Sequence, residues 1–341
     1  KKLKPKFNWL KCYEPESHLD DVVDDLIKNK IIKKNQKLCF LTFKDYTLSN
    51  RFKKKGFKKI KLIDPVIDLR IKNKNFLTET LQYHFQKGYL NKKKHINKYN
   101  FLFARHIFEH VSDLSLFIEN AMNLIVSNGF LYLEVPDSTR AIKTGDSTLY
   151  WEEHNFYFTY KSFKRVLKRQ GYNIVFYKKY KDSLENCIVA VIQKKTQKYS
   201  IKRLKANHHL LNDYYKNLVQ NIKNTKFLFN FYKDKYPIIF YGASHLTFTF
   251  IELMGISNHV KFIIDDDKNK NKLFSPVGNL KIFTLDQTTL KEKNLFFLGL
   301  NPNHHPKVIL KLKSIYPKSI FFSIFPKTRN YYLNSTLKNE K

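Results

Sequence analysis

Several residue types are scarce in this chain of 341 residues, and each scarcity excludes a class of protein. Only three cysteines are present, Cys12, Cys39 and Cys187, and they lie far apart without a CxxC pair. We therefore expect neither a disulfide-stapled fold nor a zinc site built on cysteines, and we expect a reducing cytoplasm and no metal ion. No apolar run reaches about 18 residues, so we expect no membrane-spanning helix, and no signal peptide is recognisable.

Acidic residues are also scarce. The chain has 29 Asp and Glu residues and 63 Lys and Arg residues, which gives a formal net charge of +34. Such a charge is typical of proteins that bind nucleic acid. Here the lysines are spread over every segment and form no recognisable RNA-binding motif with the aromatic residues, which favours a lysine-biased composition instead. We therefore expect no nucleic-acid partner, although a small acidic ligand would be attracted by this field.

Hydrophobic residues make up 43% of the chain, which indicates a folded protein long enough for two cored domains. Strand and helix patterns alternate along it. We predict strands at 36–43, 59–63, 101–104 and 130–135, and two adjacent strands between 173 and 195. We predict one helix that ends at 55 and two further helices at 76–86 and 162–170. A turn is predicted at Asn128-Gly129. The expected parts are an N-terminal helical segment (1–35), a first α/β domain (36–195), a helical linker (196–235), a smaller α/β domain (236–330) and a tail (331–341).

Candidate functional residues gather where two predicted strands end. Strand 101–104 delivers Arg105 and His106, and strand 130–135 ends near Glu134 and Asp137. Ligands of open α/β sheets bind at the carboxyl ends of strands, so these side chains are expected to face one crevice. As an alternative, Arg105 pairs with Glu109 one turn away.

The loop after the second of these strands carries Glu153 and His154. A histidine titrates near neutrality and can accept a proton, and an adjacent carboxylate can hold it or share the proton. The alternative is a cap for the helix at 162–170. Tyr157 and its aromatic neighbours either stack on a sugar or fill the core.

A nucleoside site is predicted at the ends of the first two strands. Asp64 ends the second strand, where an acid can accept hydrogen bonds from ribose hydroxyls, or it caps the Asp-Pro turn. The loop KDYTLSN after the first strand contains no glycine, so its backbone cannot approach a ligand closely. Phe43, Lys44 and Asp45, together with Arg105, would shape this pocket with side chains.

The second α/β domain has a glycine turn of its own. Tyr241, Gly242 and Ala243 stand between a strand and a helix, a geometry that can hold a phosphate at the helix N-terminus. Asp265 and Asp266 end the next strand and could receive ribose hydroxyls. We predict that this turn and these acids bind the substrate.

Together these segments resemble the S-adenosylmethionine-dependent sugar C-methyltransferases. The resemblance covers about Lys37 to Pro326 and rests on FARHIFEH, NGFLYLEVPD, EHNFYFT, YGAS and IIDDDKNKNKLFSPVGNLKI. It implies two Rossmann-like domains, the first a class I methyltransferase sheet with a terminal antiparallel hairpin, the second a smaller α/β domain. The family's N-terminal zinc-binding cysteine region and its glycine-rich loop are lacking. Trp151 replaces a family Tyr, and His245-Leu246 replaces Lys-Gly.

The resemblance implies methyl transfer from S-adenosylmethionine to a carbon next to a carbonyl of a nucleotide-linked sugar, in a cleft between the domains. His154 would remove the α-proton with Glu153 orienting it, and His106 or Tyr157 would stabilise the enolate oxygen. Three alternatives stay open: an O- or N-methyltransferase acting on a related carbohydrate, a catalytically degenerate binding or scaffold protein, and an RNA methyltransferase suggested by charge alone.

Overall fold

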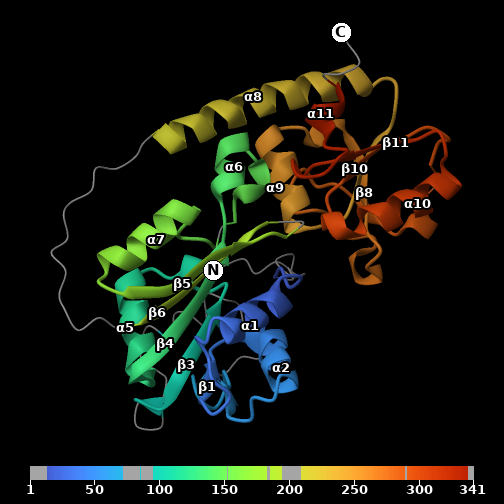
Figure 1. Cartoon of the computed structure of the whole chain (residues 1–341). Coiled ribbons are helices and arrows are strands. Elements are labelled where there is room, and N and C mark those ends of the chain that lie inside the picture. Colours follow the sequence, from blue (N-terminus) through green and yellow to red (C-terminus); the bar gives the residue numbers. More distant parts are fainter. Residues whose placement is uncertain are drawn as a thin grey trace. The chain divides into compact units, whose positions relative to one another are not determined.

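Figure 1 shows the computed structural model, in which the chain forms two compact α/β units. The residues described are 14–71, 85, 95–151, 153–182, 185–193, 209–288 and 290–336. The N-terminal unit takes Glu14–Thr139 and Trp151–Lys205, and the C-terminal unit includes Arg140–Tyr150 and Ala206–Lys341. Residues 140–150, which the sequence pattern assigns to the first domain, thus pack with the second half of the chain. The helix predicted at 76–86 lies almost wholly outside the described residues.

The sheet of the N-terminal unit has the strand order β2-β1-β3-β4-β6-β5. Strands β1 to β4 run parallel, and β6 and β5 complete the sheet as antiparallel strands. This confirms the predicted class I sheet with its terminal hairpin. The strands are β1 (Leu38–Phe40), β2 (Ile60–Leu62), β3 (Tyr99–Arg105), β4 (Ile125–Pro136), β5 (Asn173–Tyr180) and β6 (Cys187–Gln193).

The turn predicted at Asn128-Gly129 is wrong, because both residues lie inside β4. The β3–β4 register shifts between Tyr99 and Phe101, and the irregularity absorbs the residues that looked like a turn. A Cβ on Gly129 would lie 2.2 Å from Cγ2 of Ile125, so the backbone is locally too crowded for a side chain. The glycine therefore marks an irregularity in a strand, which is the other common use of this residue.

Helices cover both faces of this sheet, and each face has its own apolar core. On one face, α1 buries Leu19, Val22, Val23 and Leu26, the stripe that its helical spacing predicts. Helix α7 begins at a capping box formed by Thr159 and Ser162. Among the described residues, the other helices of the unit are α2 (Tyr46–Lys54), α5 (Leu114–Leu124) and short 3₁₀ turns, while α1 and α7 span Leu19–Lys28 and Tyr160–Arg169.

The C-terminal unit has a second, fully parallel sheet in the order β11-β10-β7-β8-β9. Its first strand in the chain, β7, is central, so the order reverses between β7 and β10 as in a Rossmann-like half. The strands are β7 (Ile238–Tyr241), β8 (Val260–Ile264), β9 (Ile282–Phe283), β10 (Leu295–Leu298) and β11 (Ile320–Ser323). The helices are α6 (Thr139–Thr144), which starts at the unit boundary, α8 (His209–Tyr232), α9 (His245–Met254), α10 (His305–Ile315) and α11 (Tyr332–Thr336).

No helix in the described part of the chain combines the length and the hydropathy needed to cross a membrane.

Phe103 offers a test of the core beneath the N-terminal sheet. It is fully buried on β3, with its ring 4.5–5.2 Å from those of Phe40, Phe101, Phe52 and Tyr132. We expect Phe103→Ala to lower the free energy of unfolding by about 3–5 kcal/mol, because it leaves a cavity in a packed aromatic cluster. Urea denaturation measures this. Ile67→Ala, at a side chain that is 72% exposed, is the matched control and should change stability little; equal losses would contradict the packing described here.

Candidate active site

A buried ion pair joins the carboxyl ends of β3 and β4. The register of the two strands places Arg105 opposite Glu134, and Nε of Arg105 lies 3.0 Å from Oε2 of Glu134. Both side chains are inaccessible to solvent. The guanidinium also donates to the carbonyls of Lys44 and Pro15. Although burial alone would raise it, Arg105 and the neighbouring histidines hold the pKa of Glu134 well below its ordinary value.

His106, the residue after Arg105, lies among three carboxylates. Its backbone is left-handed, with φ 46°, which turns the ring back toward the strand ends. Nε2 lies 3.1 Å from Oε1 of Glu134, and Nδ1 faces Glu14 at 3.2 Å and Glu109 at 3.5 Å. Burial lowers the pKa of His106, but the surrounding carboxylates outweigh it and raise the pKa well above its usual value. The ring is therefore an imidazolium at neutral pH.

Glu109 and His110 lie on a 3₁₀ turn, Phe108–His110, that follows β3. The carbonyl of Glu109 accepts from the backbone N–H groups of Asn155 and Phe156, and Nδ1 of His110 lies 2.9 Å from the carbonyl of Glu153. These hydrogen bonds hold the loop that contains His154 against the 3₁₀ turn after β3. They depend on backbone atoms of two distant segments.

The same hydrogen bonds place His154 beside His110 and Glu109. The two imidazole rings meet edge to face, with centroids 4.6 Å apart. One ligand atom from each of Glu109, His110 and His154 lies within 4.8 Å of the others. Both carboxylate oxygens of Glu109 are buried without a hydrogen-bond partner. Burial lowers the pKa of His154 to about 4, against the opposite effect of Glu109, so the ring is neutral at pH 7.

Both Glu153, predicted to orient His154 or share its proton, and Tyr157, predicted to stabilise the enolate oxygen, contact Trp151. Oε2 of Glu153 lies 3.4 Å from the indole nitrogen of Trp151, and the Tyr157 hydroxyl bonds to the backbone N–H and carbonyl of that residue, each at 3.1 Å. The ring of Tyr157 is 5.7 Å from that of His154. Glu109, which the sequence pattern suggested only as a helix cap, is thus a carboxylate close to His154. The sequence signal for Glu109 was its place in the FEH motif, Phe108–His110, shortly after the end of a predicted strand.

Polar side chains of the loop after β1 bind the loop to itself and to neighbouring segments. Asp45 is fully buried and accepts from the backbone N–H groups of Thr42 and Arg105. Burial raises the pKa of Asp45 to about 7, although Arg105 opposes the shift. Lys44 forms an ion pair with Glu14 and donates to the carbonyl of His106. Of the predicted cofactor residues, Lys44, Asp45 and Arg105 therefore hold the loop together.

Phe43 and Asp64 are the predicted cofactor residues that stay accessible. Phe43 is 43% exposed, and Tyr46 after it and Val66 and Ile67 after β2 also expose apolar side chains. Asp64 accepts from the backbone N–H groups of Val66 and Ile67 through Oδ1, as the capping alternative predicts. Only one of its two carboxylate oxygens takes part in this cap.

The predicted substrate residues come together in the C-terminal unit. Gly242 has φ 103° after β7, and a Cβ there would lie 3.0 Å from the backbone nitrogen of Leu300. Asp265 accepts from the N–H of Ala243 at 2.7 Å and pairs with Lys270 at 2.9 Å. Asp266 accepts from the Tyr241 hydroxyl at 2.8 Å. The turn and the two acids thus form one connected group, with Lys270 as a cation that the sequence pattern did not single out.

Two family models match consecutive parts of the chain. Residues 45–176 match a methyltransferase domain, and residues 174–325 match a C-methyltransferase C-terminal domain. The first match contains the cluster around Glu134 and His154, and the second contains the glycine turn at Gly242. A search of curated proteins finds no significant match.

Solved structures resemble about half of the chain. One is the Burkholderia thailandensis 1,6-didemethyltoxoflavin-N1-methyltransferase with bound 1,6-didemethyltoxoflavin and S-adenosylhomocysteine, with 8% identity, a TM-score of 0.35 and coverage of 52% of this chain and 77% of that chain. Another is a SAM-dependent methyltransferase from Aquifex aeolicus, with 12% identity, a TM-score of 0.30 and coverage of 53% and 93%. TM-scores this low add nothing to what the sheet order shows.

Asp68 supports the turn that carries Asp64, and its charge makes that support dependent on pH. Its carboxylate accepts from the N–H of Asp64 and contacts Lys61 and His95, at 2.6–3.1 Å. Burial would raise the pKa of Asp68, but Lys61 and the hydrogen bonds lower it to about 2. A lowered pKa stabilises the fold above pH 3.8, and this contribution is lost as the pH falls toward 2. We expect Asp68→Asn to be less stable than the parent at pH 7, with the difference vanishing near pH 2. Urea unfolding across this range measures it, and a constant difference would contradict the assignment.

Proposed function

Because this chain is an S-adenosylmethionine-dependent methyltransferase with a methyltransferase domain followed by a C-methyltransferase C-terminal domain, we propose that it methylates a carbon next to the carbonyl group of a nucleotide-linked keto-sugar. A carbon acceptor differs from oxygen or nitrogen acceptors because its C–H bond must first lose a proton. The observation that carries the proposal is a neutral, half-buried histidine, His154, beside the carboxylate of Glu109.

The residues after β1 and β2 fit the adenosine part of the cofactor. Phe43, Tyr46, Val66 and Ile67 offer exposed apolar surface for an adenine ring, and Asp64 keeps one carboxylate oxygen outside its cap for ribose hydroxyls. When bound, S-adenosylmethionine supplies a methyl group on a positively charged sulfur. Lys44, Asp45 and Arg105 would support this site from below by fixing the loop.

His154 is the proposed general base. Its lowered pKa leaves the imidazole unprotonated at neutral pH, so it can accept the proton from the α-carbon. Once protonated, it becomes an imidazolium next to Glu109, and that carboxylate stabilises the new charge. The imidazolium of His106, 3.5 Å from Glu109, favours the ionised form of that carboxylate.

A donor is also needed for the enolate oxygen that forms when the proton leaves. Tyr157 is better placed for this role than His106, because its ring lies beside His154 while His106 is enclosed by carboxylates. The Tyr157 hydroxyl donates to the carbonyl of Trp151 and would redirect that proton to the substrate. Glu153, the partner suggested by the sequence, would instead orient the loop through its carbonyl bond to His110.

The C-terminal unit is the proposed binding site for the nucleotide of the substrate. Gly242 and Ala243 open helix α9, whose N-terminus favours a phosphate, and Lys270 adds a positive charge at the same turn. Asp265 and Asp266 lie at the end of the neighbouring strand, where ribose hydroxyls are recognised in related folds. The overall charge of +34 favours an anionic substrate of this kind.

Calorimetry with S-adenosylmethionine tests the cofactor site. We expect Asp64→Ala to weaken binding by about 1–3 kcal/mol, or roughly 5- to 150-fold in Kd, because ribose hydrogen bonds are lost. Asp64→Asn keeps an oxygen for the cap on Val66 and Ile67 and separates the role of the charge from that of the turn. Unchanged affinity in Asp64→Ala, or no binding by the parent at millimolar ligand, would refute the site.

Solvent deuterium exchange at the substrate α-carbon, with S-adenosylhomocysteine present, isolates proton removal from methyl transfer. We expect His154→Gln to slow exchange roughly 10²–10⁴-fold, the usual contribution of a positioned base. Glu109→Gln should slow it about tenfold or more, because the imidazolium loses its ionic partner, whereas Glu153→Gln, whose carboxylate contacts Trp151, should have the smaller effect.

The outcomes of this assay separate the rival reactions. Exchange in His154→Gln as fast as in the parent would exclude His154 as the base. A parent that transfers methyl groups to a carbohydrate but catalyses no exchange would be an O- or N-methyltransferase. A larger loss in Glu153→Gln than in Glu109→Gln would restore Glu153 as the partner of His154.

A further inference from the structure

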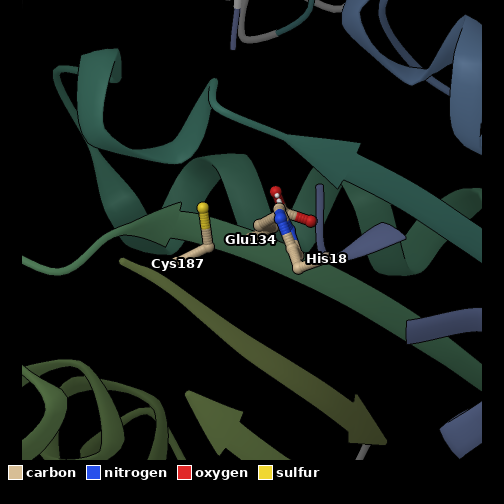
Figure 2. A group of neighbouring side chains, drawn as sticks. All are labelled: His18, Glu134 and Cys187. Atoms are coloured by element: carbon tan, nitrogen blue, oxygen red, sulfur yellow. Dashed lines mark hydrogen bonds and ion pairs between the residues drawn. The ribbon is translucent and has the colours of Figure 1, made fainter. Parts of the chain in front are cut away.

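We propose that the N-terminal unit contains a buried zinc site formed by His18, Glu134 and Cys187, with His106 completing the coordination. Figure 2 shows the first three side chains, which come from the N-cap of α1, the end of β4 and the start of β6. One ligand atom from each lies within 4.8 Å of the other two. Zinc is the metal that most often combines imidazole, carboxylate and thiolate ligands in proteins.

The distances suit a four-coordinate zinc ion. Zinc–ligand bonds of about 2.0–2.3 Å in a tetrahedron place ligand atoms roughly 3.3–3.7 Å apart. Nε2 of His18 and Nε2 of His106 each lie 3.1 Å from Oε1 of Glu134. Nε2 of His106 is 3.9 Å from Sγ of Cys187. These three separations lie within a few tenths of an ångström of the expected spacing.

The groups behind the ligands are those that orient metal ligands in proteins. The second carboxylate oxygen of Glu134 bonds to Nε of Arg105 and to the Tyr132 hydroxyl, which leaves Oε1 for the histidines or a metal. Nδ1 of His106 faces the carboxylates of Glu14 and Glu109. A carboxylate behind a metal-bound imidazole fixes the ring and raises its basicity.

Zinc binding to these ligand types is accompanied by proton release. Zinc binds a thiol as the thiolate and an imidazole as the neutral ring, so its entry releases the protons that such ligands carry. The zinc site does not depend on the proposed reaction.

All four side chains are at most 2% exposed, and this burial indicates a structural site rather than a catalytic one. A structural zinc has no position open to substrate. Here it would tie the start of α1 to β4 and β6. The four ligands are 88, 28 and 53 positions apart along the chain, and only one is a cysteine, so the pattern differs from the paired spacing by which zinc sites are recognised in sequences.

Metal analysis and cobalt substitution test the proposal on the full-length protein. We expect one zinc per chain after purification and, after unfolding with a chelator and refolding with Co²⁺, a cobalt–thiolate charge-transfer band. The band requires no variant and reports that a cysteine thiolate binds the metal. A parent that refolds without metal to its original melting temperature and shows no cobalt–thiolate band contains only a hydrogen-bonded network, and the proposal is then wrong.

Variants assign the ligands. Cys187→Ser and His18→Gln should lose the bound zinc or weaken its retention against a chelator at least tenfold. Cys39→Ser is the matched control, because Cys39 is equally buried but lies on β1, away from the cluster, and it should keep a full equivalent. Retention of zinc in Cys187→Ser at the level of the parent would overturn the assignment. If Cys187→Ser fails to fold, the cobalt band of a Cys12→Ser, Cys39→Ser protein decides the ligand, because Cys187 is then the only cysteine; absence of the band would overturn the assignment.

Discussion

The ion pair between Arg105 and Glu134 is the interaction on which the N-terminal unit depends. Two charges removed from water are tolerated only when each is paired and the remaining polar atoms are bonded. Arg105 meets this requirement by bonding the loop after β1 and the segment before α1, and Glu134 by bonding Tyr132, His18 and His106. One buried pair thereby sets the positions of three separate stretches of chain at the carboxyl end of the sheet.

From this pair, side chains of alternating charge extend toward His154. The carboxylate of Glu134 faces the imidazolium of His106, which faces Glu109, which in turn lies beside the neutral ring of His154. Each member shifts the protonation of the next, since a charged neighbour favours the opposite charge. In the proposed reaction His154 would gain a proton, and the carboxylate of Glu109 beside it would stabilise the new charge.

The fold could be predicted from the sequence to a large extent, while the partners within the site could not. Apolar strand patterns and the spaced stripe of α1 are local signals, and they identified both sheets. The contact of Glu109 with His154 depends on backbone bonds between residues 109 and 155–156, which no periodicity reveals. The pairing of Arg105 with Glu134 needed the register of two strands, and His18 was hidden at the end of a helix that reads simply as amphipathic. At Gly129 a local turn signal was overridden by a strand irregularity.

Residues 140–150 pack with the C-terminal unit although the chain belongs to the N-terminal unit on both sides of them. The polypeptide therefore passes from one unit to the other more than once, and no single cut separates the two halves cleanly. A truncation after residue 205 would strip Asp146 of its bond from Tyr214 and expose the surface that meets α9. Evolutionary exchange of the second domain would face the same obstacle, since an incoming domain must also accommodate a segment encoded within the first.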